Sequence, residues 1–355
     1  MKKHKKKIIR LEPAYSTPSG EMYAGDAKEI LAKLNRAGFK HSAQLIFTSP
    51  PFVLNRKKKY GNLTGREYIQ WLSSLAPLFA DLLKPDGSIV IELGNGWVPG
   101  KPTMSTLPLE ALLAFKRKGK FHLCQEFVCY NPARLPSPAQ WVNVERCRVK
   151  DAFTRVWWLS STPRPKADNR NVLTSYSDSM KKLLESGTYN PGHRPSEFKI
   201  GEKSFLTNNR GAIPPNVLAA SIASVVEEIT SQPGNVFALA NTGSNDGYQE
   251  HCRKNDVPLH PARMPAKLVE FFIRFLTSAN DLVIDPFAGS NTTGAVAEML
   301  GRRWKSVEIK QDYIDASRVR FDFLQPHLLA EAAVEMSGTP TKSTRKQTKV
   351  AKSSS

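Results

Sequence analysis

The sequence predicts an α/β fold in which both ends of the chain build one sheet and a smaller polar module is inserted between them. Two observations support this prediction. Apolar strands alternate with amphipathic helices over residues 22–96 and again over about 260–323. Between these blocks, residues 162–256 are irregular, rich in Pro, Asn, Ser and Gly, and contain many Lys, Arg and Tyr residues. The inserted module therefore has the composition of a binding region rather than of a core.

The elements follow in chain order. The first block contains a strand end at 22–26, a helix at 26–34, a strand at 44–50, a long amphipathic helix at 66–83 and a buried strand at 88–93. The second contains a helix at 266–277, a strand at 281–287, a helix at 292–300, a strand at 304–309 and a helix at 312–324. We interpret residues 1–14 as a basic arm, 15–161 and 257–325 as the two parts of one domain, and 326–355 as an extension. The Ser/Thr/Lys-rich end from about Ser337 is predicted to be disordered.

The composition excludes several classes of protein. With 355 residues and 40% hydrophobic content, the chain is able to bury a sizeable core. No stretch approaches the roughly 20 apolar residues of a membrane helix, and the basic N-terminus lacks the apolar region of a secretory signal. The four cysteines, Cys124, Cys129, Cys147 and Cys252, have spacings of neither a disulfide framework nor a metal site. We expect a soluble cytoplasmic protein without a metal.

The charge balance indicates a polyanionic partner. There are 51 Lys and Arg residues against 32 Asp and Glu, which gives a net charge of +19. Six basic residues in the first ten positions and five after Pro340 supply eleven of these charges, so the body of the chain keeps about +8. The alternative is that solvated tails merely raise the total.

A glycine loop follows an apolar strand at residues 281–301 and leads into a helix, the position at which α/β sheets bind ligands. Its glycines, Gly289 and Gly294, fit neither the dinucleotide pattern nor a phosphate-binding Walker loop, since Ala295 stands where that loop needs Lys. Glu308 ends the next strand, where an acid accepts the ribose hydroxyls of a nucleoside cofactor. Without a pyrophosphate signature, this pattern favours S-adenosylmethionine over NAD. An ordinary strand–helix turn is the alternative.

A second unusual feature is Ser49-Pro50-Pro51-Phe52 at the end of the strand 44–50. Two consecutive prolines stop a strand and fix the backbone. The Ser49 hydroxyl and the Pro50 carbonyl are then able to accept from one exocyclic amino group, and Phe52 offers a face on which a base stacks. A Pro-Pro edge turn with a buried Phe is the structural alternative.

Together, SPPF at 49–52 and DPFAGSNTTG at 285–294 resemble the motifs of the β group of DNA amino-methyltransferases, in which the catalytic motif precedes the cofactor loop. The second glycine of the family loop is replaced by Asn291. With GAIPPN at 211–216 and HPARMPAKL at 260–268, the sequence resembles the PvuII-type cytosine-N4 methyltransferases over about 15–325. The resemblance implies a Rossmann-like S-adenosylmethionine-dependent methyltransferase sheet with circularly permuted motif order. Residues 162–256 would be its target-recognition region.

The resemblance also implies an activity and a set of site residues. The enzyme would methylate N4 of a flipped cytosine in a short duplex sequence; adenine-N6 methylation and a catalytically silent DNA-binding relative are the alternatives. The catalytic residues would be Ser49, Pro50, Pro51 and Phe52. The cofactor would be bound by Asp26, Pro265, Lys267, Asp285, Phe287, Gly289, Ser290, Asn291, Thr292 and Glu308. DNA contacts are predicted for Arg56, Lys57, Lys58, Lys59, Tyr130, Trp141, Arg194 and Arg210.

Structural alternatives exist for Asp26 and for the tryptophans of a neighbouring strand. Asp26, with Glu29 three residues later, is also typical of a helix capping box. Trp157 and Trp158, in the aromatic-rich strand 154–159, suit a buried strand better than a contact with DNA. None of the cysteines follows a proline, which argues against the cysteine nucleophile of cytosine-C5 methylation. We expect a monomer that acts on double-stranded DNA at the nucleoid, alongside a cognate restriction endonuclease that it does not contact.

Overall fold

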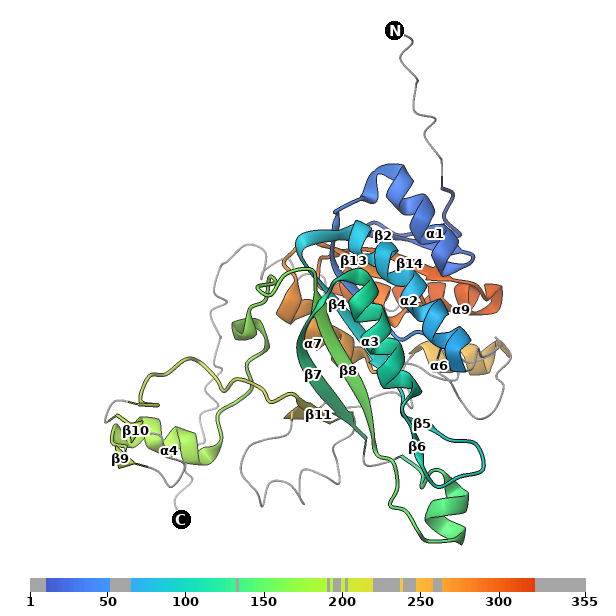
Figure 1. The fold of residues 1–355 in the computed structure, drawn as a ribbon. Helices are drawn as coiled ribbons and strands as arrows, with labels where there is room; N and C mark the ends of the chain where they lie inside the picture. Colours follow the sequence, from blue (N-terminus) through green and yellow to red (C-terminus); the bar gives the residue numbers. More distant parts are fainter. Residues whose placement is uncertain are drawn as a thin grey trace, which may run out of the picture.

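The computed structural model describes residues 11–51, 65–131, 134–189, 192–193, 199–201, 204–219, 237–238, 247–257 and 264–322. Within these ranges a single sheet of ten strands organises the fold (Figure 1). In spatial order the strands are β1 (Tyr15–Ser16), β2 (Gly20–Ala24), β14 (Arg303–Glu308), β13 (Leu282–Asp285), β3 (Ala43–Thr48), β4 (Leu83–Leu93), β8 (Phe153–Ser160), β7 (His122–Tyr130), β11 (Val217–Ala219) and β12 (Phe237–Ala238). The predicted α/β architecture, with both ends of the chain in one sheet, is confirmed.

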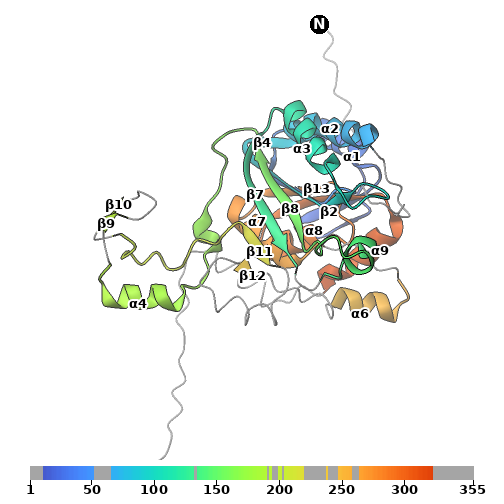
Figure 2. The same ribbon diagram turned by 60° about the horizontal axis from the view of Figure 1, so that its bottom comes forward.

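Helices cover both faces of this sheet (Figure 2). The helices are α1 (Ala27–Leu34), α2 (Gly65–Leu82), α3 (Leu107–Gly119), α4 (Asp178–Ser186), α6 (Gly247–Lys254), α7 (Ala266–Leu276), α8 (Thr292–Met299) and α9 (Gln311–Asp322). Short elements complete the description: the hairpins β5 (Gly96–Trp97) with β6 (Met104–Ser105) and β9 (Gly192–His193) with β10 (Lys199–Ile200), and helical turns at Asn35–Phe39, Gln140–Val144 and Asn169–Val172. Every helix and strand predicted in the two blocks is present, with bounds shifted by a few residues.

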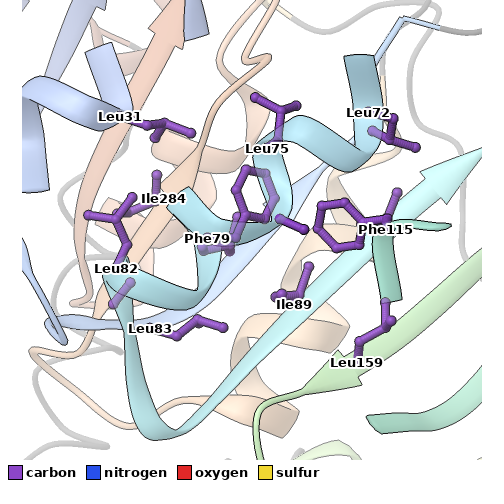
Figure 3. Close-up of a cluster of buried hydrophobic side chains, with 14 of the residues drawn as sticks. Leu31, Leu72, Leu75, Phe79, Leu82, Leu83, Ile89, Phe115, Leu159 and Ile284 are labelled. Carbon is purple, nitrogen blue, oxygen red and sulfur yellow. The ribbon is translucent and has the colours of Figure 1, made fainter. Parts of the chain in front are cut away.

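The two faces of the sheet bury separate hydrophobic clusters. One cluster packs α1, α2 and α3 against alternate residues of the central strands, for example Phe79 and Phe115 against Ile89 (Figure 3). The other packs α7 and α8 against the opposite face, where Phe272 lies 5.7 Å from Phe47 between ring centroids. Strands that are buried on both faces explain the continuous apolar runs in the sequence.

The segment 162–256 departs from the prediction of a separate module. Its strands β11 and β12 extend the main sheet, because β11 pairs in parallel with β7 and β12 pairs with β11. In contrast, α4 and the β9–β10 hairpin lie away from the sheet (Figures 1 and 2). The segment is therefore partly an edge of the domain and partly a projection from it.

The centre of the sheet contains a topological switch point. Strands β2, β14, β13, β3 and β4 are parallel; the chain passes from β13 to β14 on one side and from β3 to β4 on the other. In such sheets the crevice outside the carboxyl ends of the two diverging strands is the ligand site. The predicted glycine loop follows β13 and the predicted catalytic motif follows β3, so both open into this crevice.

Two features are absent from the described residues. No helix among them is long and apolar enough to span a bilayer. Within the same ranges, no three His, Cys, Asp or Glu side chains are grouped so that they could hold a metal ion.

Candidate functional site

The strand end at Ser49 is tied directly to the glycine loop. Thr48, the last residue of β3, donates a hydrogen bond from Oγ1 to Oδ1 of Asp285, the last residue of β13, over 3.0 Å. Both side chains are buried. The structure thus brings together two motifs that lie 237 residues apart in the sequence. Ser49 follows at once and is half-buried, whereas Phe52 lies outside the described residues.

Ser49 has a carboxylate partner that the sequence did not reveal. In the parallel pairing of β3 with β4, Thr48 stands opposite Ile91, which brings Glu92 beside Ser49. The Ser49 hydroxyl and Thr154 Oγ1 both hydrogen-bond to the Glu92 carboxylate, the latter over 2.9 Å. Burial raises the pKa of Glu92, and these two hydrogen bonds oppose the rise. With its proton directed toward Glu92, Ser49 Oγ keeps its lone pairs for another donor.

The Pro50 carbonyl is a second open acceptor. Pro50 and Pro51 have no N–H, so the chain does not continue the ladder of β3 beyond Thr48. No backbone N–H of the described chain donates to the Pro50 carbonyl. The strand end therefore carries two adjacent acceptors, one hydroxyl and one carbonyl. Their contact with an amino group stays a prediction.

The glycine loop is held by its own hydrogen bonds. Asp285 accepts from the Phe287 amide over 3.0 Å and from Thr293 Oγ1 over 2.6 Å, in addition to Thr48. Gly289 adopts φ +53°, a left-handed conformation that glycine tolerates, and its amide donates to Glu308 Oε2 over 2.8 Å. Burial raises the pKa of Asp285 to about 6, against the effect of these donors. Asp285 consequently supports the loop and is saturated by neighbours within the protein.

Asn291 shows why the family glycine is replaceable in this loop. It has φ +52° and ψ +41°, and asparagine tolerates this left-handed region better than other side chains do. Its side chain is fully buried; it accepts from the Gly294 amide and Ser306 Oγ and donates to the Tyr15 hydroxyl. Only the backbone of Asn291 is thus in a position to line a cofactor.

The other predicted loop residues are also packed inward. The side chains of Ser290 and Thr292 are buried. Phe287 is half-buried, and its ring lies 5.5 Å from that of Trp71 between centroids. Their predicted contacts with the methionine end of the cofactor would therefore come mainly from the backbone, and they stay predictions.

Glu308 ends β14 at the same edge and its carboxylate already has three donors. The amides of Gly289, Ile309 and Lys310 donate to it over 2.8, 2.9 and 2.9 Å. A carboxylate has about four lone-pair positions, so about one remains. If Glu308 holds both ribose hydroxyls, as predicted, one of these backbone bonds must open. Next to it, Ile309 is 63% exposed and presents an apolar surface.

Asp26 lies beside Glu308 across the neighbouring strand. The Gly25 amide donates to the Glu308 carbonyl over 2.9 Å. The Asp26 carboxylate caps α1 by accepting from the Lys28 and Glu29 amides over 2.9 and 3.1 Å, which confirms the capping role. Asp26 is nevertheless exposed. Its contact with the adenine of a cofactor stays a prediction.

The helix α7 begins at the site edge. It precedes β13 and runs antiparallel to it, so its first residues lie near the carboxyl ends of the strands. Pro265 immediately precedes α7, and Lys267 forms an ion pair with Glu270 over 2.8 Å. Leu268 and Phe272 are fully buried, which confirms core packing by this helix. The cofactor contacts of Pro265 and Lys267 are untested.

Arg320 is a second residue that sequence reasoning missed. From α9, its Nε and Nη2 donate to the Ser290 carbonyl and hydroxyl over 2.6 and 3.0 Å. Its guanidinium lies 4.2 Å from the ring centroid of Tyr248 on α6. In the sequence, Arg320 is distinguished only as a basic residue in a predicted helix. Arg320 thus supports the glycine loop through hydrogen bonds to Ser290 and connects it to α6 through its contact with Tyr248.

The residues predicted to bind DNA are only partly described. Tyr130 ends β7 at the site edge and Trp141 lies in the turn Gln140–Val144; both are half-buried. Arg210 is exposed, with φ +69°. The remaining predictions, Arg56, Lys57, Lys58, Lys59 and Arg194, lie outside the described residues.

Two cysteines of β7 are unsuited to nucleophilic chemistry. Burial raises the pKa of Cys124 to about 11 and that of Cys129 to about 12. The nearby charge of Glu92 further raises the pKa of Cys129. Because the thiolate is the nucleophile, these residues stay inert near neutral pH. This agrees with the argument against a cysteine-dependent reaction.

The comparisons with known proteins point to one family. A family model described as DNA methylase matches residues 43–319. The chain is 45% identical over 312 residues to the type II methyltransferase M.PvuII of Proteus hauseri, covering 87% of this chain and 86% of the relative. It is 23% identical over 301 residues to M.BglII of Bacillus subtilis, covering 83% and 67%. Among solved structures, PvuII DNA methyltransferase (cytosine-N4-specific) superposes with a TM-score of 0.65 at 37% identity, covering 92% of this chain and 96% of that one.

Proposed function

Because the chain belongs to the DNA methylase family and is a DNA methyltransferase, we propose that it methylates the exocyclic N4 nitrogen of cytosine in a short duplex sequence. The observation that carries this proposal is the Thr48–Asp285 hydrogen bond, which joins the Ser49-Pro50 acceptors to the glycine loop. The similar PvuII enzyme, whose description specifies cytosine N4, supports the choice of base. Adenine N6 is the competing target.

The cofactor is S-adenosylmethionine, and the residues at the edge of β14 fit its adenosine half. The exposed Ile309 offers an apolar surface to a base, the Glu308 carboxylate is an acceptor for ribose hydroxyls, and the exposed Asp26 is an acceptor for an amino group. When bound, S-adenosylmethionine supplies a methyl group activated on a sulfonium. The glycine loop would hold the remainder through its backbone.

The protein prepares the amino nitrogen for attack. The lone pair of the cytosine amino group is delocalised into the ring, so its N–H bonds must be held for the lone pair to turn toward the methyl group. Ser49 Oγ accepts one N–H and the Pro50 carbonyl accepts the other. Glu92 keeps the Ser49 proton away from the substrate by accepting it in a hydrogen bond. Ser49 and Pro50 thus act on the substrate, and Glu92 positions Ser49.

The target base must leave the helix to reach this crevice, since the strand end lies within a half-buried site. Phe52 is the proposed stacking partner. Tyr130 stands three strands from β3, about 14 Å away at the usual strand spacing. Tyr130 is therefore better placed to contact DNA beside the target than the target itself.

We also propose a cellular setting for the enzyme, consistent with a DNA substrate. The enzyme acts as a monomer on double-stranded DNA at the nucleoid in the cytoplasm. Its partner in function is a restriction endonuclease that recognises the same sequence and makes no direct contact with it.

The test is to digest DNA from cells that express the chain and to identify the methylated nucleosides by mass spectrometry. We expect N4-methylcytosine, absent from cells that express the Ser49→Ala variant. N6-methyladenine in its place would transfer the same mechanism to adenine. DNA bound without any methylated product would indicate a silent DNA-binding relative and would contradict the proposal.

A further inference from the structure

The loop between β7 and β8, residues 131–152, exposes an unusual number of apolar side chains. Leu135, Val144 and Val149 are 81%, 68% and 88% exposed. The other large apolar residues exposed in the described chain are Leu113, Leu123, Phe205, Ile213 and Ile309, of which only Phe205 and Ile213 share one connection, that between β10 and β11. Single exposed apolar residues are ordinary, but three on one loop indicate a surface that contacts something.

This loop is anchored firmly at its base. Asn95, which follows β4, donates from Nδ2 to Asp151 Oδ1 over 2.8 Å and to the Phe153 carbonyl over 3.2 Å. Arg134 donates to the same carbonyl over 2.9 Å and lies 3.6 Å from the Asp151 carboxylate. The exposed side chains therefore project from a fixed support, and little ordering remains when they contact a partner.

The loop stands beside the catalytic strand end. β7 and β4 run in the same direction on either side of β8, so the loop leaves the sheet at the edge where β3 ends. Figure 1 shows it projecting past this edge, next to β5 and β6. The charge of Arg134 acts on Glu92, the partner of Ser49. Leu135 follows Arg134 directly. Of the three exposed apolar residues, it is therefore the nearest in sequence to a residue that acts on Glu92.

The charge of the loop selects the kind of partner. Its basic residues are Arg134, Arg146, Arg148 and Lys150, against the acids Glu145 and Asp151, for a net charge of +2. Arg146 is exposed and has φ +55°, an uncommon conformation that recurs at functional sites. Apolar side chains flanked by positive charge are complementary to stacked bases flanked by phosphates.

We propose that the 131–152 loop contacts the DNA duplex and that Leu135 enters the base stack, where it occupies the space left by the extruded target base. This inference rests on the proposed function and adds a residue that stabilises the flipped state. Apolar wedges of this kind are used by proteins that unstack DNA. Arg146 contacts a phosphate beside the wedge.

The proposed role of Leu135 as a wedge is tested by single-turnover methylation of two DNA duplexes. Both duplexes carry the sequence that the enzyme methylates, which is first identified in DNA from cells that express the enzyme. In one, the target base is paired; in the other, it faces a mismatch, which lowers the cost of extrusion. Leu135→Ala should slow methylation of the paired duplex about 10-fold and leave the mismatched duplex near the wild-type rate.

Two matched variants serve as controls. Leu113→Ala, on the outer surface of α3, makes the same change at an exposed leucine away from the loop and should alter neither rate. Arg146→Gln should weaken binding to both duplexes equally. It should also make the dependence of DNA affinity on salt concentration shallower, by the amount expected for the loss of about one phosphate contact.

The outcomes are separable. Equal losses by Leu135→Ala on both duplexes, or no loss on either, would overturn the wedge. So would a wild-type protein that self-associates and becomes monomeric on Leu135→Ala without any change in methylation, because the loop would then be a protein interface. Failure of the proposed function appears elsewhere, in the identity of the base that the wild-type enzyme methylates.

Discussion

The glycine loop after β13 and the strand end after β3 lie side by side, yet their polar groups are used in opposite ways. In the loop, Asp285, Asn291 and Glu308 each have at least three hydrogen bonds within the protein. At the strand end, Ser49 has Glu92 as its partner and the Pro50 carbonyl has no backbone donor in the described chain. The polar side chains of the loop are thus saturated within the protein, whereas the strand end has fewer partners among the described residues, which fits the proposed role of its acceptors.

This contrast separates the effects expected of mutations. Changes in the loop should appear first as altered stability, because the Asp285 and Asn291 side chains there are buried and hydrogen-bonded. Changes at the strand end should appear as lost turnover with stability intact. Enzymes hold open acceptors in this way because groups fixed before the reaction need no reorganisation during it.

The largest effect is expected for Ser49→Ala. Removing an acceptor aimed at the reacting amino group should lower single-turnover methyl transfer about 10²-fold or more, equivalent to about 3 kcal/mol. Cofactor affinity and the free energy of unfolding should stay near the wild-type values, since Ser49 supports neither the loop nor the core. A rate equal to that of the wild type would remove Ser49 from the mechanism, and with it the main sequence argument for cytosine.

Asp285 should produce a stability effect that depends on pH. Its pKa is about 6 in the folded protein against an ordinary value of 3.8, so the neutral form favours folding. This contribution is fully present below pH 3.8 and is lost as pH rises through about 6. Asp285→Asn is neutral at every pH; relative to the wild type, it should therefore gain up to about 3 kcal/mol between pH 4 and 7.

Urea unfolding of both proteins across this pH range measures the gain, and Asp285→Ala provides the comparison. The alanine leaves Thr48, Thr293 and the Phe287 amide without their acceptor. It should therefore be less stable than Asp285→Asn by about 2–4 kcal/mol at all pH values. A difference between wild type and Asp285→Asn that does not vary with pH would show that Asp285 is not titrating in this range.

Glu92 should affect the pH profile of the rate. Its pKa is raised by burial, so the wild-type rate should fall as pH drops through that raised value, when Glu92 no longer accepts from Ser49. Glu92→Gln should lower the rate about 10-fold and flatten this limb of the profile. Thr154→Val removes a donor to the ionised form and should shift the limb to higher pH. If neither variant changes the pH at which the rate falls, Glu92 is not the group whose protonation causes that fall.

The sequence predicted the features that lie within one short segment. It did not reveal the contacts that depend on strand pairing. Apolar runs that end in Ser-Pro-Pro or in a glycine loop identified β3, β13 and their loops, because each pattern lies within one short segment. Glu92 carried no such signal: it is one acid at the end of an apolar strand, and only the register of β3 against β4 brings it to Ser49. Arg320 was missed for the same reason, because α9 folds back onto the loop.

The sequence also did not predict the two strands at the edge of the sheet, β11 and β12. Strands β11 and β12 are three and two residues long, too short for an alternating pattern to show. They join the sheet because β7 offers an open edge, which is a property of the folded domain. The exposed apolar residues of the 131–152 loop carried no signal either, since a sequence does not state which apolar side chains are left uncovered.

Glu308 should give a smaller effect on cofactor binding than an unpaired acid would. Accepting the ribose hydroxyls requires one of its three backbone bonds to open, which offsets part of the gain. Glu308→Ala should weaken S-adenosylmethionine binding by about 1–2 kcal/mol in calorimetry, with DNA binding retained. Asp26→Asn, which keeps the helix cap and removes only the charge, tests the second predicted cofactor acid in the same assay. Unchanged affinity in Glu308→Ala would disprove the ribose assignment.

The smallest effect is expected for Asn291→Gly, which restores the glycine of the related loops. Glycine relieves the left-handed strain at φ +52°, a gain of roughly 1 kcal/mol. It also removes the cap of α8 and leaves the buried Ser306 hydroxyl and Tyr15 hydroxyl each short of a partner, a loss of roughly 2 kcal/mol. The free energy of unfolding should thus fall by about 1 kcal/mol. Cofactor affinity should not change, because the Asn291 side chain points into the protein. A variant more stable than the wild type would mean that the strain outweighs the buried hydrogen bonds, and a loss of affinity at unchanged stability would place the side chain on the cofactor after all.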